Sequence, residues 1–286
     1  MQSEIVAVNA KIGWRHVLYR VSLYAMLGAL CVVFLLPVYG MFVTSFKSVA
    51  DILRNGFWGL PKVWTAQPFL QAWETARLGQ TFINTFIIAI PSVIGSIFIS
   101  ALGAYALARI EFRGSFVLFI FLIAGLFFPP QVVLYPLFKW FTWLRLYDTY
   151  LAQIITHIAY GISICTLILR NFFRTIPFEL QDAARIDGCS HLRLLLRIIL
   201  PLSKPALAAL TIFQFTWIWN NFLWGLVLSD QKSVPIMVGV MILKGQYLIQ
   251  WNAQAAGTLL ASLPVIIVFL AFQKYFIRGL LMGSSK

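Results

Sequence analysis

The residues best suited to chemistry lie in one charged segment, 179–205, between two long apolar runs. Acidic side chains near the start of a helix are favoured by its dipole, and a glycine allows the left-handed turn that ends one. Alanines let another surface approach closely. The segment therefore predicts a helix–turn–helix that docks a protein partner. Its candidate residues are Glu179, Asp182, Ala183, Ala184, Asp187, Gly188, Leu200 and Pro201, followed by Pro205.

The rest of the chain offers little for catalysis. Its three histidines, His16, His157 and His191, are too far apart for a metal-binding spacing, and the three cysteines suggest neither a disulfide nor a metal site. The nine acidic residues, nearly all in predicted loops, give no buried carboxylate pair. No Gly-x-x-x-x-Gly-Lys-[Ser/Thr] sequence occurs, so the chain has no phosphate-binding loop of this kind. We expect a non-catalytic protein without a metal or cofactor of its own.

Composition indicates a membrane protein. Hydrophobic residues make up 60% of the chain and charged residues 11%, against about 25% charged in soluble domains. Mean hydropathy is +0.85. A bilayer span needs about 20 apolar residues, and six stretches qualify: 21–43, 82–108, 116–138, 151–173, 206–228 and 255–276. The expected fold is an all-α integral membrane protein with six transmembrane helices. Residues 1–20 form an N-terminal segment, and residues 21–286 form one six-span domain that includes a coupling segment, 177–205.

The positive charge is unevenly distributed between the two sides of this topology. Six spans place both termini on one side, and 14 of the 22 Lys and Arg residues fall there. The positive-inside rule then makes both termini and the coupling segment cytoplasmic. Because this distribution accounts for the net charge of +13, we expect membrane lipid around the chain and no nucleic acid.

The order and spacing in the coupling segment resemble the coupling motif of inner-membrane permease subunits of binding-protein-dependent ABC importers. In that family an acidic residue and two alanines precede Asp-Gly, and Leu-Pro and a second proline follow about a dozen residues later. Asp182 replaces the family's usual glutamate and keeps its charge. Asn84-Thr85, residues 217–224 and residues 272–280 resemble the carbohydrate-importer branch, of the maltose-transporter type. The resemblance covers nearly the whole chain.

The resemblance implies a permease subunit of the bacterial inner membrane with several partners. These are a second homologous permease, a dimer of ATPase subunits that binds ATP and Mg²⁺, a periplasmic substrate-binding protein and a sugar. In the family the last outer loop, here 229–254, contacts the binding protein. Its candidate contact residues are Lys244, Gln246 and Gln250.

An uncharged path with aromatic rings suits a sugar, because rings stack on sugar faces and amides bond hydroxyl groups. The candidates are Asn84, Gln131, Tyr135, Gln153, Gln214, Trp217, Asn220 and Asn221. The proline-rich run 128–136 is expected to break the third span. A polyol or a glycerol phosphate ester is an alternative substrate. An ion-coupled secondary transporter would need charged residues in its spans, where His157 is the main titratable group, and a membrane enzyme is a third alternative.

Overall fold

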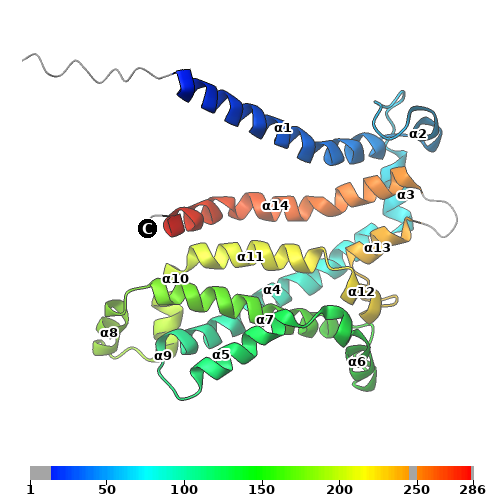
Figure 1. Cartoon of the computed structure of the whole chain (residues 1–286). Helices are drawn as coiled ribbons and strands as arrows, with labels where there is room; N and C mark the ends of the chain where they lie inside the picture. The colour runs from blue at the N-terminus through cyan, green and yellow to red at the C-terminus, as the bar shows by residue number, and fades with distance from the viewer. Residues whose placement is uncertain (1–13, 245–249, 285–286) are drawn as a thin grey trace, which may run out of the picture.

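The computed structural model describes residues 14–244 and 250–284, and helix is the only regular secondary structure in this part. Four helices are long and apolar enough to cross a membrane, and the number rises to six if each of two bent pairs is one span. The four are α1 (Trp14–Ser45), α4 (Leu78–Arg109), α7 (Tyr150–Thr175) and α14 (Trp251–Ser284). The start of α1 and the end of α14 lie at the same end of the molecule (Figure 1).

The centre of the fold is the close pair α4 and α7; α11 (Lys204–Trp219) packs beside α4, and α14 packs beside α11. Small residues make this approach possible. An added Cβ at Gly161 of α7 would lie 2.7 Å from Cβ of Ser96 on α4. Trp219 is fully buried and donates from its indole N–H to the Ala261 carbonyl at 2.8 Å. This bond joins α11 to α14.

The third span breaks where the prolines predict it. Helix α5 (Ser115–Ala124) and the short η1 (Gly125–Phe127) stop before Pro129, and α6 (Pro130–Trp143) continues at 96°. Proline has no N–H to donate and fixes its own backbone angle. The predicted break is confirmed, and the stretch 116–138 lies on both arms of this bend instead of forming one straight helix.

The fifth predicted span, 206–228, was wrong in its extent. Helix α11 stops at Trp219, and a separate helix α12 (Leu223–Leu228) follows. Asn220 donates its side-chain amide to the Thr216 carbonyl, and Asn221 accepts from the Trp224 backbone N–H, both at 2.9 Å. Asparagine side chains that bond the backbone compete with helix continuation.

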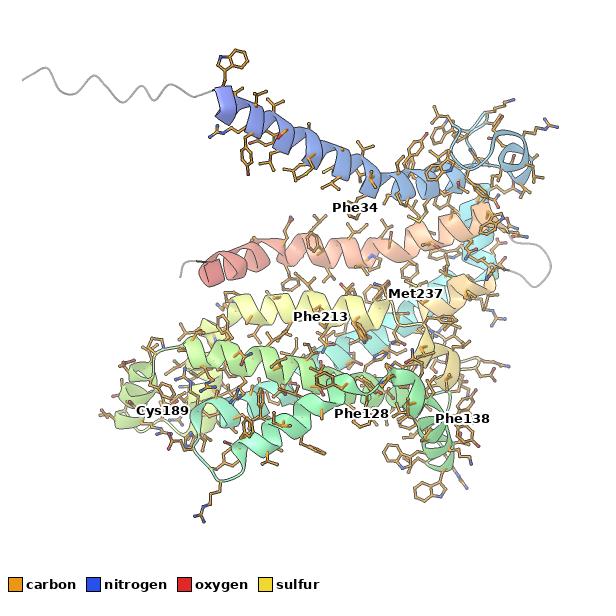
Figure 2. All side chains as sticks on the ribbon, viewed as in Figure 1. Phe34, Phe128, Phe138, Cys189, Phe213 and Met237 are labelled. Atoms are coloured by element: carbon orange, nitrogen blue, oxygen red, sulfur yellow. The ribbon has the colours of Figure 1, made fainter. Side chains whose placement is uncertain are left out.

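Helix α1 begins at Trp14, inside the predicted N-terminal segment, and contacts α14. Most of its apolar side chains are exposed; Phe34, labelled in Figure 2, is 75% exposed. Three short helices lie at the opposite end from α8 (Glu179–Ile186) (Figure 1). They are α2 (Val49–Asn55), α3 (Gln67–Thr75) and α13 (Ile236–Ile242).

Candidate coupling segment and translocation cavity

The coupling segment folds as a helix, a turn and a second helix. Helix α8 ends at Ile186 with Asp187 as its C-cap, and Gly188 has a φ of 76°, which glycine adopts without the strain that a Cβ brings. Ser190 caps α9 (His191–Leu194) by accepting from the Arg193 N–H at 3.4 Å. A π turn, η2 (Leu195–Ile199), and α10 (Leu200–Leu202) then lead into α11 across an 80° bend.

The predicted coupling residues do not all face outward. Glu179, Asp182, Ala183, Asp187, Gly188 and Pro201 are exposed, and Leu200 is partly buried. Ala184 is only 6% exposed and belongs to a cluster with Leu194 and Leu195, so it joins α8 to the following helix. Ile186 was missed from the sequence. It is 88% exposed, and its signal is an isolated apolar side chain among charged neighbours.

Two contacts tie the coupling segment to α4. The hydroxyl of Tyr105 lies 3.0 Å from Nδ1 of His191. The guanidinium of Arg109 donates to the carbonyls of Phe173 and Ile176 and lies 4.3 Å from the centre of the Phe178 ring. A movement of α8 is thus linked physically to the ends of α4 and α7.

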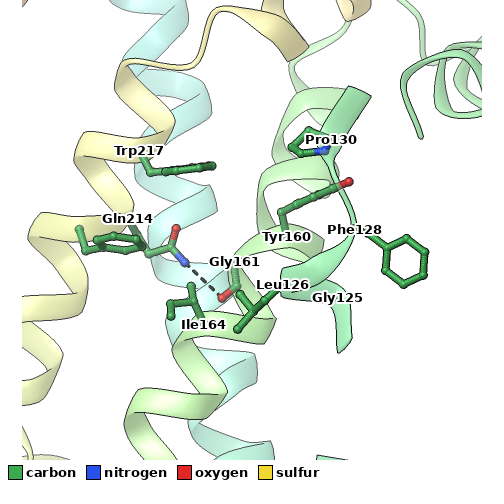
Figure 3. A pocket seen from close by; sticks show the side chains of 10 residues that line it. Gly125, Leu126, Phe128, Pro130, Tyr160, Gly161, Ile164, Gln214 and Trp217 are labelled. Atoms are coloured by element: carbon green, nitrogen blue, oxygen red, sulfur yellow. Dashed lines mark hydrogen bonds between the residues drawn. The ribbon is translucent and has the colours of Figure 1, made fainter. Parts of the chain in front are cut away.

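Two cavities meet beside α11. The first, about 260 Å³, lies between α7, α11 and the break after η1 (Figure 3). The second, about 690 Å³, lies along α11 and the turn that follows it. Phe213 and Trp217 line both, and neither lining contains a charged side chain. Amides and aromatic rings supply the polar and flat surfaces.

Most of the predicted path residues line these cavities. Gln214 lines the first and donates to the Gly161 carbonyl at 3.2 Å, as Figure 3 shows. Gln131, Asn220 and Asn221 line the second. Tyr135 lines neither; it is 65% exposed, with Lys139 Nζ 4.8 Å from its ring centre. Four aromatic lining residues were missed because an aromatic residue in an apolar span carries no distinguishing signal; they are Phe128, Tyr160, Phe213 and Phe222.

Asn84 and Gln153 are placed differently from the prediction. Both are buried. The amide of Asn84 donates to the carbonyls of Lys232 and Val234 at 3.0 and 2.9 Å, and Gln153 donates to that of Ser233 at 2.8 Å. They hold the chain after α12 and line neither cavity, so we leave them out of the path.

Asp148, which sequence reasoning missed, also holds the chain after α12, at residues 230–233. Its carboxylate accepts from the backbone N–H groups of residues 230–233 at 3.0–3.2 Å and from the Ser233 hydroxyl at 3.1 Å. Partial burial alone would raise its pKa, but these backbone donors lower the pKa of Asp148 to about 2.

The predicted contact residues of the outer loop have separate positions. Lys244 is exposed. Gln250 accepts from the Gln71 side-chain amide at 2.6 Å, which ties it to α3. Gln246 lies outside the described residues.

Comparison with known proteins identifies the class. Residues 97–281 match the family described as "binding-protein-dependent transport system inner membrane component". The chain belongs to this family and is a permease component of an ABC transporter.

Two relatives and one solved structure cover nearly the whole chain. The osmoprotective compounds uptake permease protein GgtD of Synechocystis sp. is 34% identical over 88% of this chain and 87% of its own. The arabinooligosaccharides transport system permease protein AraQ of Bacillus subtilis is 32% identical over 94% and 96%. A bacterial ABC transporter that imports the acidic polysaccharide alginate matches in fold, with a TM-score of 0.77, 24% identity and coverage of 91% and 96%.

Proposed function

We propose that this permease forms, with a second homologous permease, the membrane path of an importer for a neutral sugar or oligosaccharide. A periplasmic protein delivers the sugar, and a dimer of ATPase subunits, which binds ATP and Mg²⁺, docks on the coupling segment. The observation that carries the proposal is the pair of uncharged cavities around Trp217. The larger, about 690 Å³, lies within the range of about 300–1,000 Å³ that small-molecule sites occupy.

The chemistry of the cavity linings favours sugars over the alternative solutes. Trp217 offers a flat apolar face, while Gln131, Asn220 and Asn221 offer donors and acceptors for hydroxyl groups. A glycerol phosphate ester would carry a negative charge, and neither lining supplies a cation to balance it. The name of AraQ supports an oligosaccharide. The name of GgtD keeps a small neutral osmoprotectant, such as a polyol, as the second candidate.

The partner proposal rests on the coupling segment and on the family. Helix α8, which carries the exposed Asp182 and Ala183, lies at the same end of the molecule as the start of α1 and the end of α14 (Figure 1). With the positive-inside rule, this end is the cytoplasmic one. Cysteines placed at Arg193 and at Asp230 in a cysteine-free chain test the orientation. Labelling of Arg193→Cys from outside intact cells would show that the proposed sidedness is wrong.

Uptake into proteoliposomes tests the sugar path. The reconstituted importer, with its binding protein and internal ATP, is given labelled arabino-oligosaccharides, neutral disaccharides or polyols. We expect Trp217→Ala to lower uptake of the transported sugar about two- to tenfold, because about 0.5–1.5 kcal/mol of ring contact is lost while the sugar passes. ATP hydrolysis stimulated by the binding protein should persist.

Trp143→Ala is the matched control, since Trp143 is 77% exposed at the end of α6 and lines neither cavity. Unchanged uptake by Trp217→Ala, or transport of polyols alone, would contradict the sugar path.

A further inference from the structure

A third cavity lies beneath the coupling segment and has a very different lining. Its volume is about 720 Å³, and it is bounded by the ends of α4 and α7, the chain between α4 and α5, and the helices α8 and α9. Four arginines and one histidine line it, against two carboxylates, those of Glu111 and Asp182. The five basic residues are Arg109, Arg170, Arg174, Arg185 and His191. Arg109 and His191 also make the contacts that tie the coupling segment to α4, but neither ATPase docking nor the sugar path accounts for Arg170, Arg174 and Arg185.

Two of these arginines are fixed in place without being neutralised. Arg109 is 5% exposed; it bonds two backbone carbonyls, while its Nε and Nη1 atoms have no hydrogen-bond partner. Arg170 donates Nε to the Leu107 carbonyl at 3.4 Å, and its guanidinium lies 3.8 Å from the centre of the Phe119 ring. Within the part of the chain that the structure describes, none of the four arginines forms an ion pair. Four guanidinium groups therefore share the cavity with two carboxylates, those of Glu111 and Asp182, and the lining keeps an excess of positive charge.

We propose that this cavity binds a phosphate group, carried by the headgroup of an anionic phospholipid or by a soluble phosphate compound. Guanidinium groups match phosphate oxygens with paired N–H donors, and a bound anion would relieve the repulsion among the arginines. Basic pockets between membrane helices are a recurring site for acidic lipid headgroups. Bound there, the phosphate would bridge α7 and α8 and hold the coupling segment against the spans.

The position of the cavity favours the lipid as the source. Arg170 and Arg174 lie in the last two turns of the membrane-spanning α7, where headgroups are expected. The adjoining start of α5 exposes a continuous apolar surface; Phe116 and Val117 are each 70% exposed, and Phe121 is 75% exposed. Acyl chains could cover this surface while the phosphate lies among the arginines. If the arginines instead bound a carboxylate of an ATPase subunit, no exposed apolar surface would be needed beside the cavity.

Native mass spectrometry tests the proposal on the full-length chain purified with its accompanying subunits. The probe is dioleoyl phosphatidylglycerol, mixed with dioleoyl phosphatidylcholine as the zwitterionic reference. We expect Arg174→Gln to weaken phosphatidylglycerol binding about fivefold and the double variant Arg170→Gln/Arg174→Gln about thirtyfold, from the usual contribution of a basic residue at an acidic membrane surface. Arg174 is exposed, and its side chain forms no hydrogen bond or ion pair with the described residues, so its variant should fold.

Arg113→Gln is the matched control. Arg113 is an exposed arginine between α4 and α5, beside the cavity but not in its lining. In a second arm, inorganic phosphate and glycerol 3-phosphate compete with the lipid. Competition at millimolar concentration would assign the phosphate site to a soluble compound, and its absence would assign the site to lipid. An equal loss in Arg113→Gln, or unchanged lipid binding with loss of ATPase subunits, would overturn the proposal.

Discussion

At the scale of single residues, Asp148 fixes the chain that follows α12. Five donor groups of residues 230–233 make six hydrogen bonds to its carboxylate, just before the start of α7. An asparagine has one acceptor oxygen, and its NH₂ group would face the other backbone donors. We expect Asp148→Asn to destabilise the protein by about 1.5–3 kcal/mol, as for a hydrogen bond to a charged group. Thermal unfolding of the purified protein measures this effect, and Asp230→Asn is the control because its carboxylate is exposed.

The same carboxylate predicts a pH dependence. Because folding lowers the pKa of Asp148 from 3.8 to about 2, its contribution is complete above about pH 4 and is lost as the pH falls toward 2. The stability difference between wild type and Asp148→Asn should therefore shrink between about pH 4 and pH 2. A constant difference over this interval would show that the carboxylate charge is not what holds the segment.

Local rules predicted some of these residues but could not predict others. The turn at Gly188 and the cap at Ser190 depend on neighbours a few positions away. Asn84 instead bonds carbonyls about 150 positions further along the chain, and Asp148 bonds N–H groups more than 80 positions away. A polar residue in or near a span gives the same sequence signal whether it lines a path or bonds to a distant loop.

At the scale of elements, the close pair α4 and α7 makes a strong prediction. A Cβ at Gly161 would lie 2.6 Å from Nε2 of Gln214 and 2.7 Å from Cβ of Ser96. Gly161→Ala should push the helices apart and cost about 1–3 kcal/mol, with uptake reduced because the first cavity changes shape. Gly103→Ala is the control, since a Cβ there meets nothing within 4 Å. Equal stability of the two variants would contradict this packing.

The coupling segment supports a second prediction at this scale. A Cβ at Gly188 would contact no neighbour, so only its positive φ resists substitution. Valine there should strain the turn by about 1–3 kcal/mol, shift α8 relative to α9 and uncouple ATP hydrolysis from uptake while the chain still inserts in the membrane. Gly188→Asn should retain most activity, because asparagine tolerates this conformation. Near-normal uptake by Gly188→Val would refute the role of the turn.

Element boundaries were predictable where proline determined them and not where asparagine did. Pro129 and Pro130 predict the break after η1. Nothing as strong marks the end of α11, because Asn220 and Asn221 end the helix through side-chain bonds that depend on the local geometry. The two breaks together create the cavity walls around Trp217. The proposed path thus lies where spans are interrupted, and hydropathy detects only uninterrupted spans.

At the scale of the whole molecule, the coupling segment and the outer loop occupy opposite ends of the helices (Figure 1). The ties at Tyr105 and Arg109 connect one end to α4 and α7, and Asn84, Asp148 and Gln153 connect the other end to the same two helices. We infer that α4 and α7 carry movement between the ATPase side and the binding-protein side as rigid elements.

The outer loop provides the test at this scale. Lys244 is exposed, while Gln250 is bonded to Gln71 and anchors the start of α14. We expect a glycine–serine replacement of residues 244–249, with Gln250 kept, to leave assembly with the ATPase intact. It should abolish the rise in ATP hydrolysis when loaded binding protein is added, because the loop no longer holds that protein open over the cavity. Gln250→Ala is the companion variant and should lower thermal stability more than stimulation. If the binding protein still stimulates ATP hydrolysis fully in the glycine–serine variant, the loop is only a connector. The binding protein would then dock on other elements at this end, such as α2 and α3.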